Sequence, residues 1–569
     1  EWVIALLIFE LARRSYQQLK RQELMMILHM CGSLTSLAGY VTISGGVFAT
    51  LIFHYYQKNS SIFESFNLTE KIPDWFAPSF NDIVTRDFLQ EAWVPAITVA
   101  LLTYLFSRIQ YFGIGYIVFR ITSDYEKLPY PMSRISSEGI MALTDSNKND
   151  ESSWRWGVFA FMAMIGVVWG FFYMGIPSIS KAIFGTRTEI IPIPFLDLTK
   201  YTENIFPAAL WGIGFDFTLV LIAFVMPKRV TIGIIITSFI CHLFLPPIMY
   251  NSGIYTQWQK GFSMLDTSIA NSLDLWMSVG IGAAISVPIT AIMMTAKIYR
   301  SNISIDAEKH DNLNEKKAIS NDRGDISTWL SISLYLFSSG GFVILTHGII
   351  NLGWLGGIEK TPDQYFPIWI LILFSMIWGP IMTYINAKMI GIAGQHISVP
   401  YVKEGILITS GYKQPDIWVS PLSSTGGDFS GATVTFKTLE LTKTKFTSLF
   451  KVELFAFILL TISGLFFFSY LWSVGPIPSD QFPYAQKMWP FITKSAALWY
   501  SALGEGNNLV LDALKPNVIG GSLVFFISLY GILSVTGIPL AYYFGAVSGI
   551  GVFPYITIPY AFALIEFLL

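Results

Sequence analysis

Long runs of apolar residues, separated by short polar segments, recur along the whole chain. A helix that crosses the hydrocarbon of a membrane needs about 20 mostly apolar residues. Ten runs are strong candidates: Leu24–Phe53, Trp93–Phe119, Trp156–Ile176, Phe206–Met226, Val230–Tyr250, Leu275–Ala296, Thr328–Leu352, Phe366–Ile385, Val452–Val474 and Val518–Phe544. Three weaker runs are Glu1–Leu11, Thr493–Leu514 and Ile556–Leu569. The pattern predicts an all-α, polytopic membrane protein with about 12–16 transmembrane or re-entrant helices.

Composition agrees with this prediction and excludes several classes of protein. Of the 569 residues 53% are apolar and 13% are charged, whereas a soluble domain carries about 25% charged residues. A net charge of −2 provides no basic field for nucleic acid. Cys31 and Cys241 both lie in apolar runs, so neither a disulfide framework nor a cysteine metal site is expected. Because Walker A, HExxH and Cys/His motifs are missing from the sequence, we predict no cofactor, no metal site and no enzymatic activity.

The distribution of positive charge predicts how the chain is oriented. Twenty-four Lys and Arg residues lie in the segments 12–23, 120–155, 227–229, 297–327 and 387–451. The polar segments predicted to lie on the opposite side of the membrane carry 11. Cytoplasmic loops are enriched in positive charge, so the first set is predicted to be cytoplasmic. Asn59 and Asn67 then lie outside, each in a glycosylation triplet. We expect a multi-pass glycoprotein of the cell membrane whose chain continues beyond both ends of this sequence.

A short repeat predicts that the chain is duplicated. The tetrapeptide Ala208–Trp211 recurs as Ala496–Trp499, an offset of 288 residues, and each copy is preceded by a Pro-Ile-Pro loop. Tandem repeats are common in secondary transporters. We therefore predict two homologous halves, residues 1–300 and 327–569, joined by a charged cytoplasmic linker at 301–326.

Two segments interrupt the apolar pattern with proline, glycine and polar residues. They are 128–143, which begins Leu-Pro-Tyr-Pro, and 388–432, which ends in the Ser/Gly-rich stretch Trp418–Ala432. Irregular backbone at membrane depth survives only inside protein or beside water. These segments are therefore predicted to be re-entrant and to line a cavity. The alternative is an ordinary cytoplasmic loop with a short amphipathic helix.

Ionisable residues within apolar runs are costly unless they are paired or hydrated. Asp216 has apolar neighbours on both sides, which favours a carboxylate that loads protons; the alternative is a structural hydrogen-bond partner. His29, His242 and His347 also lie in runs and could relay protons, although a buried neutral histidine bonded to a backbone carbonyl is the commoner arrangement. We predict Asp216, His242 and His347 as the proton-coupling groups. Glu453 lies near a cytoplasmic helix end, where we expect its carboxylate to reach water.

Several short motifs follow one another in an informative order. They are Gln22-Glu23-Leu24 with Gly45-Gly46, Leu128-Pro129-Tyr130-Pro131 with Glu138, Pro227 through Pro247 with Gly253, Gly426-Gly427-Asp428 before Phe436-Lys437-Thr438, and the glycine-rich stretch Gly545–Ile558. In this order they resemble the oligopeptide transporter (OPT) superfamily over nearly the whole chain. The pattern departs from that family at Leu24 and Leu439, where the family carries Asn and Gly.

The resemblance implies a symporter that imports small peptides, glutathione-like compounds or metal–chelator complexes, generally driven by protons. We expect alternating access between the two halves, with a peptide-like solute, protons and membrane lipid as partners and with homo-oligomerisation left open. Seven residues of the irregular segments are candidates for substrate binding: Arg134 and Lys437 for a carboxylate, Glu138, Glu404 and Asp428 for an amine, and Gln395 and His396 as polar lining.

Two other classes of protein remain as alternatives. The first is a non-transporting scaffold subunit of a cell-surface complex, with the outer segment 57–92 and its aromatic residues Trp75, Phe76 and Phe80 as a docking surface. The second is a membrane enzyme, for which the sequence supplies neither a nucleophile–base pair nor a set of metal ligands.

Overall fold

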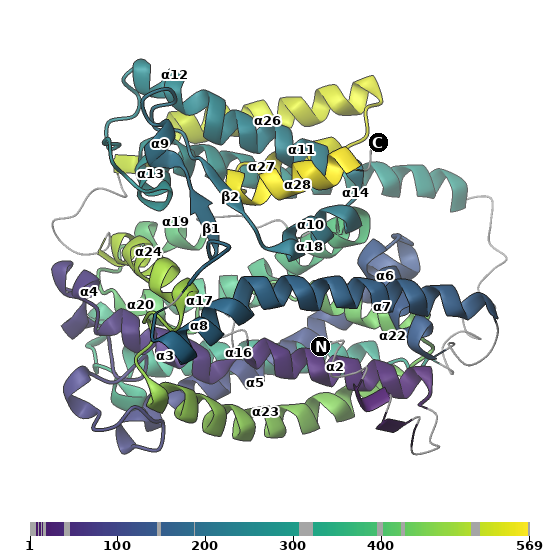
Figure 1. Cartoon of the computed structure of the whole chain (residues 1–569), viewed down its shortest axis with the longest axis horizontal. Coiled ribbons are helices and arrows are strands. Elements are labelled where there is room, and N and C mark those ends of the chain that lie inside the picture. Colours follow the sequence, from purple (N-terminus) through teal and green to yellow (C-terminus); the bar gives the residue numbers. More distant parts are fainter. Residues whose placement is uncertain are drawn as a thin grey trace. The chain divides into compact units, whose positions relative to one another are not determined.

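The computed structural model describes residues 7–9, 11–12, 14, 19–38, 46–144, 150–186, 188–306, 323–394, 396, 402–422, 427–501 and 512–566. In these residues the chain is mostly helical, with one small sheet (Figure 1). The chain divides into two compact units. Unit 1 is formed by Glu1–Val167, Asp311–Gly391 and Gln414–Thr493, and unit 2 by Val168–His310, Ile392–Lys413 and Lys494–Leu569.

Unit 1 is built from long helices joined by short helical turns. Its elements are α2 (Arg21–Ala38), α3 (Val47–Lys58), α4 (Ser61–Ser65), η2 (Thr69–Lys71), η3 (Phe80–Asp82), η4 (Glu91–Trp93), α5 (Val94–Phe119), η5 (Arg120–Tyr125), α6 (Pro131–Thr144), α7 (Asp150–Gly170), α16 (Thr328–Asn351), η9 (Trp354–Gly356), η10 (Pro362–Gln364), α17 (Ile368–Ile372), η11 (Leu373–Trp378), α18 (Gly379–Ala393), α20 (Asp416–Val419), α22 (Gly431–Leu441), α23 (Phe446–Val474) and α24 (Pro483–Ser501). Helices α7, α18 and α24 end in residues of unit 2.

Unit 2 combines helices with the two strands. Its elements are η6 (Phe171–Gly175), α8 (Ile176–Phe184), β1 (Phe195–Asp197), α9 (Thr199–Thr202), β2 (Gly212–Gly214), α10 (Phe217–Val225), α11 (Lys228–Phe239), η7 (Ile240–Phe244), α12 (Leu245–Asn251), α13 (Met264–Asn271), η8 (Ser272–Trp276), α14 (Met277–Asp306), α19 (Val402–Thr409), α26 (Pro516–Thr536), α27 (Ala541–Gly549) and α28 (Pro554–Glu566). The strands pair antiparallel, with Leu196 opposite Ile213.

Eight helical stretches in the described residues are long and apolar enough to cross a membrane. They are Glu91–Tyr125, Ala160–Lys181, Lys228–Asn251, Met264–Ala291, Thr328–Asn351, Ile368–Ile392, Phe446–Val474 and Pro516–Thr536. Each overlaps one of the ten runs expected from the sequence. The chain is therefore a multi-pass, helical membrane protein, as predicted. Which membrane it occupies, and its orientation there, stay predictions.

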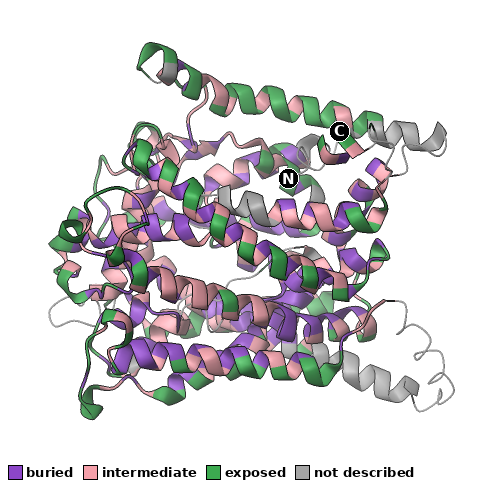
Figure 2. Cartoon of the chain, turned by 90° about the horizontal axis from the view of Figure 1, so that it is seen from below, coloured by how far each residue is buried: buried purple, intermediate pink, exposed green. Residues whose placement is uncertain are grey.

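Helix α23 shows why these helices suit a lipid environment. Its buried face carries Leu449, Glu453, Ala456, Leu460, Gly464, Phe468 and Trp472. Its exposed face carries Leu454, Ile458, Ile462, Phe466 and Tyr470, each four residues from the next. Residues four apart lie on one face of a helix, so the outer face of α23 is a continuous apolar stripe. Figure 2 shows buried and exposed positions side by side along the helices. Such a stripe is suited to contact with lipid tails.

The predicted span Phe206–Met226 is wrong. Its first half folds as a loop and strand β2, and only α10, nine residues long, is helical. Nine residues rise about 14 Å, which is well short of the hydrocarbon thickness of about 30 Å. Pro207, Gly212 and Gly214 interrupt the run, and β1 supplies the backbone partners that β2 needs. Ala208–Leu210 are buried by protein packing, whereas Leu221, Ile222 and Phe224 on α10 are exposed.

Other predicted boundaries also shift. The run Val518–Phe544 divides at Gly537, whose φ of 72° ends α26 before α27 begins. The run Leu24–Phe53 corresponds to α2 and α3, and 39–45 between them lie outside the described residues. Of Thr493–Leu514, residues 502–511 lie outside them as well. The segment 128–143 forms α6, which matches the amphipathic helix of the alternative interpretation; its depth in the membrane stays a prediction.

The compact units do not follow the predicted halves. Each unit draws residues from both 1–300 and 327–569. A duplication concerns the sequence and not which segments pack together, so the duplication itself stays a prediction. The predicted linker 301–326 includes the end of α14, and 307–322 lie outside the described residues. Its last residues, Arg323–Ile326, belong to unit 1 and make specific contacts there.

Candidate functional site

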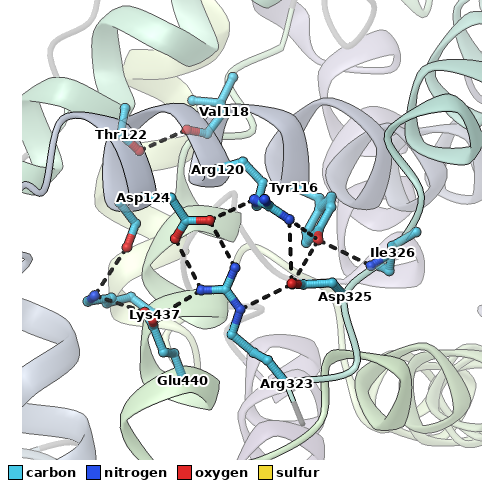
Figure 3. Close-up of polar contacts among 11 residues, drawn as sticks. Tyr116, Val118, Arg120, Thr122, Asp124, Arg323, Asp325, Ile326, Lys437 and Glu440 are labelled. Atoms are coloured by element: carbon cyan, nitrogen blue, oxygen red, sulfur yellow. Dashed lines mark hydrogen bonds and ion pairs between the residues drawn. The ribbon is translucent and has the colours of Figure 1, made fainter. Parts of the chain in front are cut away.

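Arg323 lies at the centre of a charged network in unit 1 (Figure 3). Its guanidinium donates two parallel hydrogen bonds to Asp124, Nη1 to Oδ1 at 3.1 Å and Nη2 to Oδ2 at 2.9 Å. It also donates to Asp325 and Glu440, each at 3.1 Å. The guanidinium carbon lies 5.2 Å from the ring centre of Phe446 and 5.7 Å from that of Phe119. Arg323 is thus held by three carboxylates from three different segments of the chain.

A second arginine completes the network. Arg120 Nε lies 2.6 Å from Asp124 Oδ2, one helical turn further along the chain. The hydroxyl of Tyr116 accepts from Arg120 and from the backbone N–H of Ile326, and it donates to Asp325 at 3.0 Å. These contacts fix the chain that enters α16 against the end of α5. The π-helical turn η5 carries Arg120 and Asp124.

Lys437 is the third cation of this network. Its Nζ lies 2.8 Å from Glu440 Oε2 and donates to Ser123 at 3.1 Å. Arg120, Arg323 and Lys437 therefore face Asp124, Asp325 and Glu440, three positive charges against three negative ones. Burial alone would lower the pKa of Arg323, but the carboxylates of Asp124 and Asp325 outweigh it and raise that pKa above its usual value. A network with equal numbers of positive and negative charges stabilises the packing of the helices that it joins.

A smaller polar group lies at α18. Lys388 Nζ is 3.1 Å from Glu126 Oε1, which also accepts a hydrogen bond from the hydroxyl of Tyr384 at 2.6 Å. Asn386, on the same helix, donates to Asp428 Oδ2 at 3.0 Å. The other carboxylate oxygen of Asp428 accepts from the N–H of Ser430 at 2.8 Å, immediately before α22. Asp428 therefore links α18 to the start of α22.

The predicted substrate-binding residues fall in both units. In unit 1, Lys437 and Asp428 have the partners described above, while Arg134 and Glu138 are exposed on α6. In unit 2, Glu404 lies half-buried on α19 and His396 is exposed. Gln395 lies outside the described residues. Next to Glu404, burial lowers the pKa of Lys403 to about 8, against the opposing effect of that carboxylate. A substrate role for all seven residues stays a prediction.

The three predicted proton-coupling groups have contacts of a structural kind. Asp216 precedes α10, and its Oδ1 accepts from the N–H of Thr218 at 2.9 Å, as N-cap residues do. The ring of His242 is buried, with Nε2 2.9 Å from the carbonyl oxygen of Ile550. His347 Nδ1 lies 2.8 Å from the amide of Asn351. The contact of His242 with a backbone carbonyl is the one named in the alternative interpretation, and a proton-coupling role for all three residues stays a prediction.

Glu453 does not reach water as predicted. Its side chain is 8% exposed, and its Oε1 lies 2.5 Å from His29 Nε2. The two residues are 424 positions apart in sequence, so no local pattern could have paired them. The same holds for Arg323, whose Asp124 partner is 199 positions away. The sequence signal for Glu453 was a carboxylate within an apolar run. Its position near a helix end led to the wrong prediction that its side chain is hydrated.

The two glycosylation candidates differ in their surroundings. The side-chain amide of Asn59 donates to the carbonyl oxygens of Tyr55 and Pro78, at 3.0 and 3.2 Å. Asn67 is exposed. A glycan on Asn59 would have to replace one of those hydrogen bonds, so the geometry favours Asn67. Modification of either residue stays a prediction.

Among the described residues, no group of three or more His, Cys, Asp or Glu side chains is placed to hold a metal ion. The chain matches no protein-family model, and no curated protein matches it. The OPT resemblance therefore remains an expectation that rests on the short motifs alone.

Proposed function

We propose that this chain is a secondary active transporter of the OPT type. It would import small peptides, or related peptide-like or metal-chelate solutes, together with protons by alternating access. The observation that supports the proposal is the frequency of π-helical turns in the candidate spans. Five of the eight contain a π-helical turn: η5, η6, η7, η8 and η11. Fewer than about 1% of residues in globular proteins are π-helical, and such turns are frequent at functional sites.

The π turns supply carbonyl oxygens to partners outside their own helix. In unit 1, the carbonyl of Ser375 in η11 accepts from the hydroxyl of Tyr335 on α16, and that of Thr122 in η5 accepts from the N–H of Leu128 at 3.1 Å. In unit 2, the carbonyl of Asp274 in η8 accepts from Lys515 Nζ at 2.6 Å. Carbonyl oxygens in these turns therefore bond outside their own helix, and that of Thr122 lies in the last turn of its helix.

His242 in η7 provides a fourth case. Its carbonyl oxygen accepts from the N–H of Leu210 at 2.9 Å, in the loop that precedes β2. A carbonyl that can bond either along its helix or to a neighbour permits two helix geometries of similar energy. Helices that change geometry around a site are the basis of alternating access. A passive scaffold has no need of such turns in most of its spans.

The direct test is transport by the purified protein in liposomes. We expect uptake of radiolabelled glutathione or of a radiolabelled tetrapeptide to rise when the lumen is alkaline, and a protonophore to abolish the rise. Liposomes that take up neither solute faster than protein-free liposomes, with or without the gradient, would contradict the proposal.

A variant at a π turn links transport to the observation. Tyr335→Phe removes the hydroxyl that bonds the Ser375 carbonyl but keeps the ring. We expect it to change the rate of uptake at least severalfold. Tyr470→Phe is the matched control, because Tyr470 is 69% exposed on α23. Equal rates for the two variants and the wild type would show that this π turn takes no part in transport.

One observation supports the scaffold alternative: two large apolar side chains of the segment 57–92 are exposed. In the outer segment 57–92, Trp75 and Phe76 are buried, at 2% and 5% exposure, contrary to a docking role for them. Phe80 and Val84 are exposed, at 71% and 93%. A scaffold subunit would co-purify with a partner in a stoichiometric complex and lose it on Phe80→Ser, with no uptake by liposomes.

A further inference from the structure

Three helices of unit 1 bring ionisable side chains together: α2, and α5 and α23, which are candidate spans. His29 projects from α2 and Glu453 from α23, and Nε2 and Oε1 lie 2.5 Å apart. The side chains are 15% and 8% exposed. Glu453 lies seven residues, or about 10 Å, into α23. Because this carboxylate is buried, its charge must be balanced by neighbours.

Arg108 provides that balance from α5. Its Nη1 lies 3.7 Å from the same Oε1 of Glu453, a distance at which the charges attract without a hydrogen bond. The guanidinium carbon lies 5.0 and 5.9 Å from the ring centres of Tyr104 and Tyr111. Arg108 is fourteen residues from the start of α5 and eleven from its end, so its charge lies in the middle of a span.

Tyrosine and threonine side chains also border the cluster. Tyr104 and Tyr111 face the cluster from α5, and the hydroxyl of Tyr111 lies 2.7 Å from that of Thr435 on α22. The titratable and charged groups around Glu453 in the described residues are therefore His29 on α2, and Arg108, Tyr104 and Tyr111 on α5. Of these groups, His29 and Glu453 are the two joined by a direct contact that can hold a shared proton.

Counting charges shows what one proton does. With His29 neutral, Arg108 and Glu453 cancel and the cluster has no net charge. One added proton, held between His29 Nε2 and Glu453 Oε1, gives the cluster a charge of plus one. It also changes the contact between α2 and α23 from a hydrogen bond with one charged partner to one between two opposite charges, which adds a direct attraction between them. Proton binding therefore changes how tightly these two helices are joined.

We propose that the His29–Glu453 pair is the proton-loading site of this transporter, with Arg108 as the positioning charge that keeps Glu453 ionised when the pair is empty. This rests on the proposed transport function. It assigns proton coupling to residues other than Asp216, His242 and His347. Those three are held by an N-cap hydrogen bond, a backbone carbonyl and an asparagine amide, whereas His29 and Glu453 bond to each other across two helices.

The first experiment is independent of transport. Infrared difference spectra of the purified protein, recorded as the pH is stepped across the neutral range, report carboxylate and imidazole groups that change protonation. We expect Glu453→Gln and His29→Asn each to remove the same component of the wild-type difference spectrum. Glu64→Gln, at an exposed carboxylate on α4, is the matched control and should keep that component. A component that survives in both variants, or that is lost instead in Asp216→Asn, would overturn the proposal.

The second experiment separates coupling from transport. With the membrane potential clamped at zero, a pH gradient of one unit can drive about tenfold accumulation of an electroneutral solute per proton. We expect Glu453→Gln to reduce accumulation of radiolabelled glutathione to onefold while exchange of glutathione at equal pH continues. Accumulation that persists would overturn the proposal. Failure of the wild type to transport at all would refute the transport function and leave the infrared result to decide the proton site.

Glu453→Gln leaves Arg108 without its counter-charge, so the variant could misfold. The double variant Glu453→Gln with Arg108→Gln removes both charges and restores neutrality. It should fold, exchange glutathione and still fail to accumulate it. If the double variant accumulates glutathione as the wild type does, the proposal is wrong.

Discussion

In unit 1 long charged side chains reach from one helix to the next, in addition to close backbone packing such as that of Gly113 on α5 against α16. In unit 2 close backbone packing joins the helices, and the ion pair of Lys494 with Asp266 is exposed. The Arg323 network joins η5, α22 and the segment before α16. Lys388 and Glu126 join α18 to the end of η5. Lys360 and Asp416, whose side chains are 5% and 8% exposed, form a further buried ion pair in the same unit.

Unit 2 shows close packing at glycine. A Cβ on Gly233 of α11 would lie 2.7 Å from the carbonyl oxygen of Tyr542 and 2.9 Å from the Cα of Gly545. Figure 1 shows α11 and α27 running side by side. A Cβ on Gly282 of α14 would clash with the carbonyl oxygen of Ile519 and would lie 2.9 Å from the backbone nitrogen of Leu523. Small residues that let backbones approach in this way are typical of helix pairs in membranes.

The two kinds of packing respond differently to their surroundings. An ion pair depends on protonation and on the solvation of both partners. Close backbone packing depends on shape, because dispersion contacts fall off within fractions of an ångström. We therefore expect unit 1 to be the part that responds to protons and unit 2 to be the more rigid part. The proposed proton site at His29 and Glu453 lies in unit 1.

The largest effect is expected from Arg323→Ala. It leaves Asp124, Asp325 and Glu440 with too little positive charge, and breaking such partly buried pairs costs about 3 kcal/mol. Arg323→Lys keeps the charge without the planar fork and should recover part of this loss. Arg134→Ala, at an exposed position on α6, should leave stability unchanged.

The chain's two buried cysteines allow each unit to be followed separately. Cys31 lies in α2 of unit 1 and Cys241 in η7 of unit 2. In a Cys241→Ala background, a maleimide dye should label Cys31 at a lower temperature in Arg323→Ala than in wild type. Unchanged labelling of Cys31 would show that the network contributes little to the stability of unit 1.

A smaller effect is expected from Gly233→Ala. The added methyl group meets backbone atoms, which cannot move aside cheaply, and overpacking of this kind costs about 2 kcal/mol. In a Cys31→Ala background we expect earlier labelling of Cys241. Gly531→Ala is the matched control, since a Cβ at Gly531 on α26 meets nothing within 4 Å. It should be neutral or stabilise by up to about 1 kcal/mol through helix propensity. Similar shifts for both variants would refute the steric basis of the packing in unit 2.

Much of the fold follows from hydrophobic runs, and the exception is instructive. In Phe446–Val474 the apolar residues cover the whole helix surface except at isolated positions, and a span was predicted correctly. Phe206–Met226 is similarly apolar, but it contains strand β2 and the short helix α10. A run of apolar residues reports that a segment avoids water. It does not distinguish lipid from the inside of a protein, which also buries Ala208, Ala209 and Leu210.

Less of the candidate site could be predicted. Lys437 and Asp428 were recognised by residue type, but their partners Glu440, Ser123 and Asn386 depend on how helices pack. Arg323 and Asp325 follow a charged segment of mixed sign, which is typical of a solvated linker. Only the tertiary arrangement brings Asp124 to Arg323. The pattern of charges along the sequence could not have identified this network.

The smallest effect is expected at the hydroxyl groups that accompany the glycine contacts of unit 2. Ser522 Oγ, on α26, donates to the carbonyl oxygen of Val279 on α14 at 2.7 Å. That carbonyl keeps its place in the helix of α14, and hydrogen bonds between membrane helices contribute about 0.6 kcal/mol on average. Ser522→Ala should therefore advance labelling of Cys241 only slightly, by less than Gly233→Ala does. Thr536→Ala is the control, because its hydroxyl bonds only within α26, to Ile532 and Leu533. A loss at Ser522 that equals or exceeds the loss at Gly233 would mean that polar contacts stabilise unit 2 at least as much as close backbone packing does, and the contrast with unit 1 would disappear.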